Sequence, residues 1–233
     1  MATGIMSARE DEIKLLLDNL EGLKTESFLK KNFYQGTIAG QQVVLTTSGV
    51  GKVRAAARAQ FLFDRFPIER LIFVGWAGAL NPQLEPGDVV VSSRTFQHDF
   101  DLSGCFDREK QRSFWYEADP RLVDLALKAG ERLGMAGHIR LGPVLSGDQS
   151  INLPERKQWL WQTFGGECVE MEGAAVAAVC WMSQIPFVII RGISDLADEN
   201  WLQTFEKWSS ESSARACRVV LEMLKSLSQL DGG

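Results

Sequence analysis

The sequence predicts an α/β fold in which a central mixed β-sheet is flanked by helices. Three observations lead to this prediction. Short β-branched runs alternate with longer amphipathic segments, the short runs are almost continuously apolar, and no repeat or proline-rich linker divides the 233 residues. Such alternation is typical of α/β folds, and apolar strands suit a sheet that is covered on both faces. We therefore expect one domain over residues 1–233, with a strand order that periodicity alone does not give.

Four strands and four helices can be placed from the residues. The β-branched runs predict strands at Gln42–Thr47, Leu71–Gly75, Asp88–Ser92 and Phe187–Arg191. Helical spacing of apolar residues predicts helices at Lys52–Phe66, Pro120–Leu133, Glu172–Ser183 and Trp201–Leu227. The third helix is almost wholly apolar, so we expect it to be central and buried, whereas the long amphipathic fourth helix should pack on the outside.

Composition and charge disfavour several classes of partner. The net charge of -5 weakly opposes binding to nucleic acid or to anionic membranes. The four cysteines form no CxxC pair and lie beside only two histidines, so we expect no metal, no cofactor and buried free thiols. The longest apolar stretch is far shorter than the roughly 20 residues of a membrane-spanning helix. The first residues lack the pattern of a secretory signal, so we expect a cytoplasmic protein.

Two glycine-containing segments follow predicted strands. In SGVGK, residues 48–52, glycines at a strand-to-helix turn would let the backbone approach a ligand, and a helix N-terminus offers free N–H groups. The segment does not match the P-loop pattern. In GWAGAL, residues 75–80, small residues follow a strand, at the position where open α/β sheets bind ligands. A tight structural turn would also explain either segment.

Three acidic segments are candidates for binding or catalysis. Glu170 and Glu172 stand at the start of the most apolar helix, where carboxylates can accept bonds from vicinal sugar hydroxyls or simply cap the helix. Asp195 follows a buried strand, which favours a raised pKa, although it could also be a helix cap. The run from Arg9 to Glu12, taken alone, is typical of a solvated helix start.

In order along the chain, Ser7–Glu12 and the segments SGVGK, GWAGAL, PGDVVVS, SGD, VEMEGAAVA and RGISDLAD resemble the nucleoside phosphorylase and nucleosidase superfamily. The similarity is greatest to its methylthioadenosine/S-adenosylhomocysteine nucleosidase branch, and it covers essentially the whole chain. The resemblance implies a small-molecule partner, a purine nucleoside. It also implies hydrolysis of the N-glycosidic bond of that nucleoside, with release of adenine and the free pentose.

The resemblance also implies catalytic roles. Asp195, with Ser194 beside it, would donate a proton to purine N7 and so improve the leaving group. Glu12 would take the proton from the attacking water, which Arg191 would help to hold. An acid on one face of the substrate and a base on the other make chemical sense for glycoside cleavage.

Other positions would bind the substrate. Glu172 would bind the ribose hydroxyls, Met171 would pack against the sugar, the backbone at Ile151 would meet the purine edge, and Phe205 would close over the 5′ substituent. The remaining substrate-binding positions are Val50, Trp76, Ala77, Gly78, Ser150 and Glu170. The segment that contains Leu102 and Phe106 would line the 5′ pocket of a neighbouring subunit, which implies a two-fold homodimer.

Two residues depart from the nucleosidase pattern. Trp76 stands where a small serine is usual, and Ser150 stands where an aromatic ring commonly stacks on the base. The gained indole and the lost ring could compensate for each other, or they could indicate a changed substrate such as a deoxyadenosine-type or futalosine-type nucleoside. Trp76 could also point into the core.

Two other functions remain as alternatives. A purine nucleoside phosphorylase must hold a phosphate dianion, usually with arginines. The strand Leu71–Val74 carries no cation where bacterial phosphorylases carry an arginine, and Glu12 would repel phosphate, so the residues favour hydrolysis. A non-catalytic nucleoside-binding protein is disfavoured because Glu12, Glu172 and Asp195 are all retained.

Overall fold

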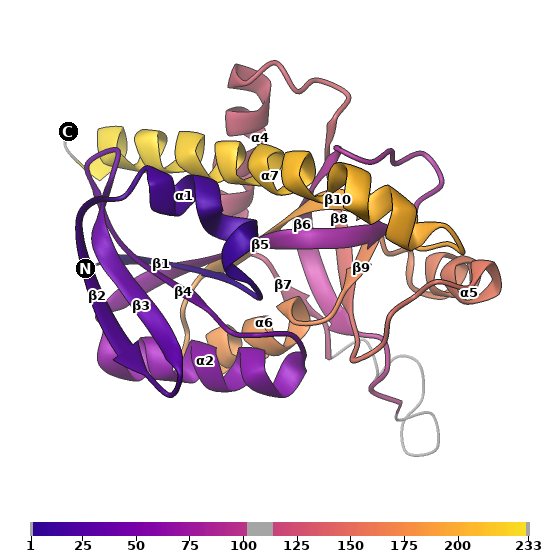
Figure 1. Ribbon diagram of the computed structural model, residues 1–233, viewed down its shortest axis with the longest axis horizontal. Coiled ribbons are helices and arrows are strands. Elements are labelled where there is room, and N and C mark those ends of the chain that lie inside the picture. The colour runs from indigo at the N-terminus through magenta and orange to yellow at the C-terminus, as the bar shows by residue number, and fades with distance from the viewer. Residues whose placement is uncertain (1, 102–113, 232–233) are drawn as a thin grey trace.

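The computed structural model describes residues 2–101 and 114–231 (Figure 1). In these ranges the strands form one ten-stranded mixed sheet. Its strands are β1 (Ala2–Ser7), β2 (Glu21–Phe28), β3 (Lys31–Ile38), β4 (Gln41–Thr47), β5 (Ile68–Ala79), β6 (Val89–Gln97), β7 (Tyr116–Glu117), β8 (Ile139–Ser146), β9 (Cys168–Glu170) and β10 (Phe187–Asp195). The α/β prediction is thus confirmed, with a sheet that contains both parallel and antiparallel pairs.

The sheet closes on itself around β5. The strand order runs β10-β6-β8-β9-β5-β1-β4-β3-β2, and β10 also pairs with β5, so five strands form a ring. Strand β5 is parallel to β1 and β10 but antiparallel to β9. The carboxyl ends of β1, β9 and β10 therefore come together along the second half of β5.

Helices cover both faces of this sheet. The helical elements are η1 (Glu10–Ile13), α1 (Lys14–Asp18), α2 (Lys52–Arg65), α4 (Pro120–Arg132), α5 (Pro154–Phe164), α6 (Gly173–Met182) and α7 (Trp201–Asp231). In Figure 1, α2 and α6 lie together below the sheet, and the long yellow α7 crosses the opposite face. Seven of the ten residues of α6 are buried, as its apolar sequence predicts.

The four predicted helices and four predicted strands are all present, but three strands continue further than expected, among them β6, which runs to Gln97 instead of ending at Ser92. Strand β5 runs through Gly75 to Ala79, so the GWAGAL segment is extended strand rather than a turn. Strand β10 continues past Arg191 and ends at Asp195, where the prediction places the carboxyl group. The sequence analysis missed β1, β2, β3, β7, β8 and β9, together with α1 and α5, whereas η1 begins within the run from Arg9 to Glu12 that was interpreted as a helix start.

Cys168, Cys180 and Cys217 are buried free thiols, as expected, and Cys105 lies outside the described residues. Over the described ranges, no helix is both long and apolar enough to cross a membrane.

Candidate functional site

A cavity of about 180 Å³ opens where β1, β5, β9 and β10 approach one another. Among the described residues, half of the lining comes from segments that follow strand ends, and the rest comes from the strands β5, β9 and β10 and from η1 and α7. The described residues that line it are Ala8, Arg9, Glu12, Val50, Trp76, Gly78, Gln149, Ser150, Ile151, Val169, Glu170, Met171, Glu172, Asp195, Trp201 and Phe205. Four of these side chains carry carboxyl groups, and one, Arg9, carries a cation. Because carboxyl groups outnumber cations in the lining, the cavity suits a substrate that is neutral or that develops positive charge.

Glu12 is the deepest acid of this wall. Its side chain is only 3% exposed, whereas Glu10 and Asp11 of the same turn are exposed. The backbone N–H of Trp76 donates to Oε1 at 3.0 Å, and the backbone N–H of Arg9 donates to Oε2 at 2.7 Å. Burial raises the pKa of Glu12, while Arg191 and these two bonds oppose the rise. The reading of this run as a solvated helix start is therefore wrong for Glu12.

Gly75 explains how Glu12 and Arg191 come so close. A β-carbon at Gly75 would overlap both Nη1 of Arg191 and Oε1 of Glu12. The glycine in this strand thus leaves room for two charged side chains rather than for a turn. Arg191 is wholly buried, and its Nη1 has no hydrogen-bond partner among the described residues. A donor without a partner beside a carboxylate is well placed to hold a small polar molecule such as water.

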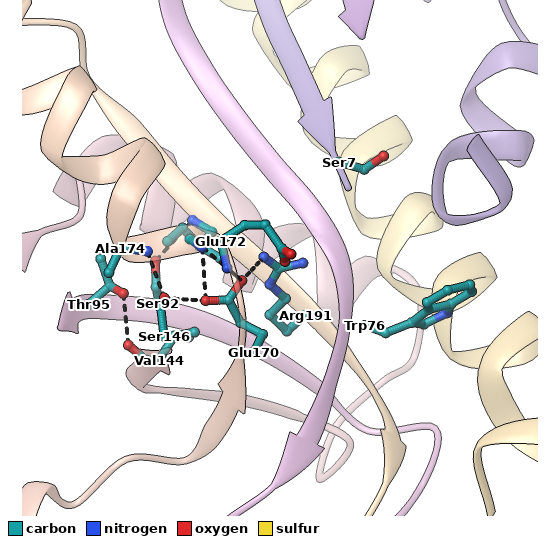
Figure 2. A network of polar contacts seen from close by, with 12 residues as sticks. Ser7, Trp76, Ser92, Thr95, Val144, Ser146, Glu170, Glu172, Ala174 and Arg191 are labelled. Atoms are coloured by element: carbon teal, nitrogen blue, oxygen red, sulfur yellow. Dashed lines mark hydrogen bonds and ion pairs between the residues drawn. The ribbon is translucent and has the colours of Figure 1, made fainter. Parts of the chain in front are cut away.

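Glu170 is mainly a structural carboxylate. It forms a buried ion pair with Nη2 of Arg191 and accepts a hydrogen bond from Ser146, as Figure 2 shows. It also accepts bonds from the backbone N–H groups of Glu172 and Gly173 at the start of α6. Glu170 therefore caps the start of α6, which was one of the two roles predicted for it, and it also lines the cavity. Breaking one partner of such a buried pair typically costs several kcal/mol.

Glu172 has a different environment. Its side chain makes no capping bond to α6 and accepts a 2.7 Å hydrogen bond from the backbone N–H of Gly51. Burial, together with the nearby charge of Glu170, raises the pKa of Glu172 to about 7. The N–H of Lys52 donates in the same way to Asp148, at 2.8 Å. The N–H groups of Gly51 and Lys52 in the SGVGK turn therefore bind two protein carboxylates, so these two donors are not free for a ligand.

Asp195 ends β10 with both carboxylate oxygens engaged. Oδ2 accepts from the Ser194 hydroxyl at 2.8 Å, and Oδ1 accepts from the backbone N–H of Ala197 at 2.9 Å. Burial raises the pKa of Asp195. A β-carbon at Gly78 would lie 2.8 Å from Oδ1, so this glycine also makes room for an acid. Asp195 caps no helix, because α7 begins only at Trp201.

Trp76 lies on the side of β5 that faces α7. In Figure 2 its indole points away from the cluster of Glu170 and Arg191. The indole N–H donates to the carbonyl of Ser209 at 2.6 Å, and the ring meets Phe205 edge to face with centroids 5.0 Å apart. The side chain is half-buried and lines the cavity. It therefore joins the strand to α7 and narrows one end of the cavity.

The structure brings most of the predicted site residues together. Three of them are buried next to the lining residues and do not line the cavity themselves, namely Ala77, Arg191 and Ser194. Leu102 and Phe106 lie outside the described residues. The sequence analysis did not assign Ala8, Arg9, Gln149, Val169 or Trp201 to the site. Adjacency was the available signal for four of them, because Ala8 and Arg9 lie in the Ser7–Glu12 segment, Gln149 precedes Ser150, and Val169 precedes Glu170. Among the described residues, no group of three or more metal-binding side chains could hold a metal ion.

Comparison with known proteins places this site in a family. The family model of the phosphorylase superfamily matches residues 2–225. A 5′-methylthioadenosine/S-adenosylhomocysteine nucleosidase of Maridesulfovibrio salexigens is 39% identical, over 97% of this chain and 100% of the relative. The crystal structure of the nucleosidase of that name from Neisseria meningitidis, in complex with methylthio-immucillin-A, matches with a TM-score of 0.89 and 31% identity, over 97% and 99% of the two chains.

A futalosine hydrolase of Helicobacter pylori has the same fold, with a TM-score of 0.89 and 28% identity over 97% of this chain and 98% of that one. Relatives with different printed substrates therefore share this architecture, so the fold alone does not select among nucleosides. The sequence identity and the coverage do select the family. The chain belongs to the phosphorylase superfamily, in the branch that contains the 5′-methylthioadenosine/S-adenosylhomocysteine nucleosidases.

Proposed function

We propose that this protein is an N-glycosidase that hydrolyses adenine nucleosides of the 5′-methylthioadenosine and S-adenosylhomocysteine class. The observation that carries the proposal is the pair of buried carboxyl groups, Glu12 and Asp195, on the wall of one cavity. Both have raised pKa values because of burial, but only Glu12 lies beside the cation of Arg191. Such different surroundings suit one group as base and the other as acid.

In the proposed reaction, Asp195 donates its proton to N7 of the adenine. The bond between N9 and C1′ breaks, its electrons stay with the base, and positive charge develops on the ribosyl ring. Glu172 holds the ribose hydroxyls from one side. Water then attacks C1′ while Glu12 takes its proton, and the buried cation of Arg191 beside Glu12 favours the ionised form of that base. The products are adenine and the free pentose.

Water is favoured over phosphate as the nucleophile. Glu170 is paired with the buried Arg191, which leaves Glu12 and Glu172 as the unpaired carboxyl groups near the nucleophile. The side chain of Arg9, the one cation among the described lining residues, is 58% exposed and paired with Asp11. A phosphate dianion would be repelled by these carboxylates, whereas neutral water would not. Phosphorolysis is therefore the weaker alternative.

Incubation of the purified protein with a panel of purine nucleosides tests the proposal. We expect free adenine, and the free pentose as the second product whether or not 10-fold excess phosphate is present, in an assay of roughly micromolar enzyme. Mass spectrometry distinguishes the free pentose from a pentose 1-phosphate. A pentose 1-phosphate would show a phosphorylase, and binding without release of any base would show a nucleoside-binding protein.

Trp76 provides a second test, because it narrows the end of the cavity beside Phe205. Trp76→Ser should change the ratio of kcat/KM between 5′-thioadenosines and other purine nucleosides by about 10- to 200-fold, the range of single pocket contacts. Trp181→Ser is the matched control, because Trp181 is 69% exposed and outside the cavity lining. A change confined to thermal stability would instead show that Trp76 is a packing residue.

We also propose that the protein is a cytoplasmic homodimer whose sites are completed by the neighbouring subunit. The proposal rests on the family to which the chain belongs and on the two-fold symmetry that is commonest among soluble oligomers. Sedimentation velocity at the concentration of the activity assay tests it. A fully active monomer would contradict the shared site.

A further inference from the structure

We propose that Arg9 selects nucleosides whose 5′ substituent ends in a carboxylate. The inference rests on the proposed function, because it takes the nucleoside to lie with its base at Asp195 and its ribose at Glu172. In that orientation the 5′ end points toward Phe205 and Trp76. The preference for a particular 5′ substituent would then come from a cation at the opening of the cavity, which does not take part in the reaction.

Arg9 belongs to the 5′ end of the cavity by position. Its guanidinium carbon lies 5.8 Å from the centroid of the Trp76 ring, and that ring contacts Phe205. The side chain is 58% exposed, so it stands at the opening rather than beside the buried Glu12. A group attached to C5′ that follows the aromatic wall outward would therefore meet the guanidinium.

The space beyond Arg9 is also suited to an anion. A second cavity of about 480 Å³ adjoins the first and shares Ala8, Arg9 and Val50 with it. Its lining adds Lys30 and Lys31, with Glu10 and Asp11 as the acids. Tyr34 donates to Glu10, and Arg9 pairs with Asp11. The two lysines have no ion-pair partner among the described residues, and the three cations Arg9, Lys30 and Lys31 outnumber the two acids by one, so the far end of a long substituent would meet a lining with a small net positive charge.

The existing pair with Asp11 does not prevent this role. Arg9 donates to Asp11 through Nε and Nη2, at 3.0 and 2.7 Å, which leaves the protons of Nη1 outside the pair. Both side chains are about half exposed, and ion pairs of this kind contribute little to stability, on the order of 0–1 kcal/mol. A carboxylate on the substrate can therefore share the guanidinium with Asp11 or displace it. Arginine also binds carboxylates in a planar, two-bond geometry that favours recognition.

Two substrates of equal size, one charged and one neutral, distinguish the effect of substrate charge on kcat/KM from the effect of substrate shape. We would compare 5′-deoxy-5′-(3-carboxypropylthio)adenosine with its primary amide, using adenine release as the readout. The unaltered protein should prefer the acid. Arg9→Met should lower the acid-to-amide ratio of kcat/KM about tenfold, mainly through KM, because one charge-assisted contact is lost. Arg9→Lys should keep part of the preference, and Asp11→Asn should increase it.

Arg121→Met is the matched control, because it removes an exposed cation on α4 that lines neither cavity. Its ratio should equal that of the unaltered protein. The preference for the acid should also weaken between 0.05 and 0.5 M NaCl, roughly the range over which the Debye length falls from above 10 Å to below 5 Å. This measurement needs no variant and so does not depend on the folding of one.

The outcomes separate the two proposals. Adenine released from both substrates, at a ratio that Arg9→Met and salt leave unchanged, would overturn the role of Arg9 and leave the glycosidase in place. No adenine from either substrate would overturn the proposed function, and the inference with it. A ratio lowered equally by Arg9→Met and Arg121→Met would show a general effect of net charge and would also contradict the role of Arg9.

Discussion

Asp195→Asn is expected to lower kcat/KM for an adenine nucleoside by on the order of a hundredfold to ten-thousandfold, the contribution of a positioned general acid. The substitution removes the proton that the leaving base needs while it keeps the size of the side chain. The protonated acid exists at higher pH than for an ordinary aspartate, because burial raises the pKa of Asp195. The alkaline side of the pH–rate profile should therefore disappear in the variant.

The local structure should survive this substitution. The amide oxygen of asparagine can still accept from the backbone N–H of Ala197, and its NH₂ can donate to the Ser194 hydroxyl, which now accepts. We expect a Tm within about 4 °C of the parent, the shift that roughly 1 kcal/mol produces in a chain of this size. Asp64→Asn, at an exposed position of α2, is the control. Activity near that of the parent would exclude Asp195 as the acid.

The distribution of residues along the chain shows what could be predicted. The buried elements α6 and β10 were predictable because apolar runs of helical or strand length leave few alternatives. Strands β2 and β3 were not, because their residues are mostly exposed or half-buried and carry no clear alternation. Two-residue turns hold them in the sheet, because β2 pairs with β3 and β3 pairs with β4, and the turn residues Leu29, Lys30 and Ala39 adopt positive φ without the Asn-Gly signal typical of a hairpin. The local sequence therefore gives no clear signal of either hairpin.

The site shows the same division. Asp195 was predictable because a carboxyl group at the end of an apolar strand is unusual in itself. Gly75 was correctly predicted as the end of an apolar strand, but the reason for a glycine there was not predictable, and a tight turn was left open as an explanation. The actual reason is the close approach of Glu12 and Arg191, which come from η1 and β10, far away in the chain. Arg9 was not predicted as a site residue, because one exposed cation in a run of charged residues is common and carries no signal of its own.

Glu12→Gln is expected to reduce kcat/KM by about a hundredfold or more, because the variant has no base to take the proton from water. In the parent, the base must be ionised, so kcat/KM should fall as the pH drops below the pKa of Glu12, which burial raises. The residual rate of the variant should lack this acid side of the profile. Glu131→Gln, at an exposed position of α4, should retain both the rate and the profile.

The same substitution has a consequence for stability whose sign follows from the pKa. The pKa of Glu12 is higher in the folded protein than in the unfolded chain, so its ionisation favours unfolding. The stability that it contributes is fully present below the unfolded value of about 4.3 and is lost as the pH rises through the folded value. Glutamine does not ionise, but it can accept only one of the two backbone hydrogen bonds from Arg9 and Trp76.

The Tm of Glu12→Gln relative to the parent should therefore rise from about pH 4.3 upward and level off once the pH exceeds the pKa of Glu12 in the folded protein, whatever its sign at the acidic end. Thermal unfolding at five or six pH values would measure this difference directly. A difference that stays constant over the range would mean that Glu12 ionises equally easily in the folded and unfolded chains. Arg191 and the two backbone hydrogen bonds would then fully offset the effect of burial on the pKa of Glu12. With a pKa near the ordinary value, the acid side of the pH–rate profile would also lie below about pH 5.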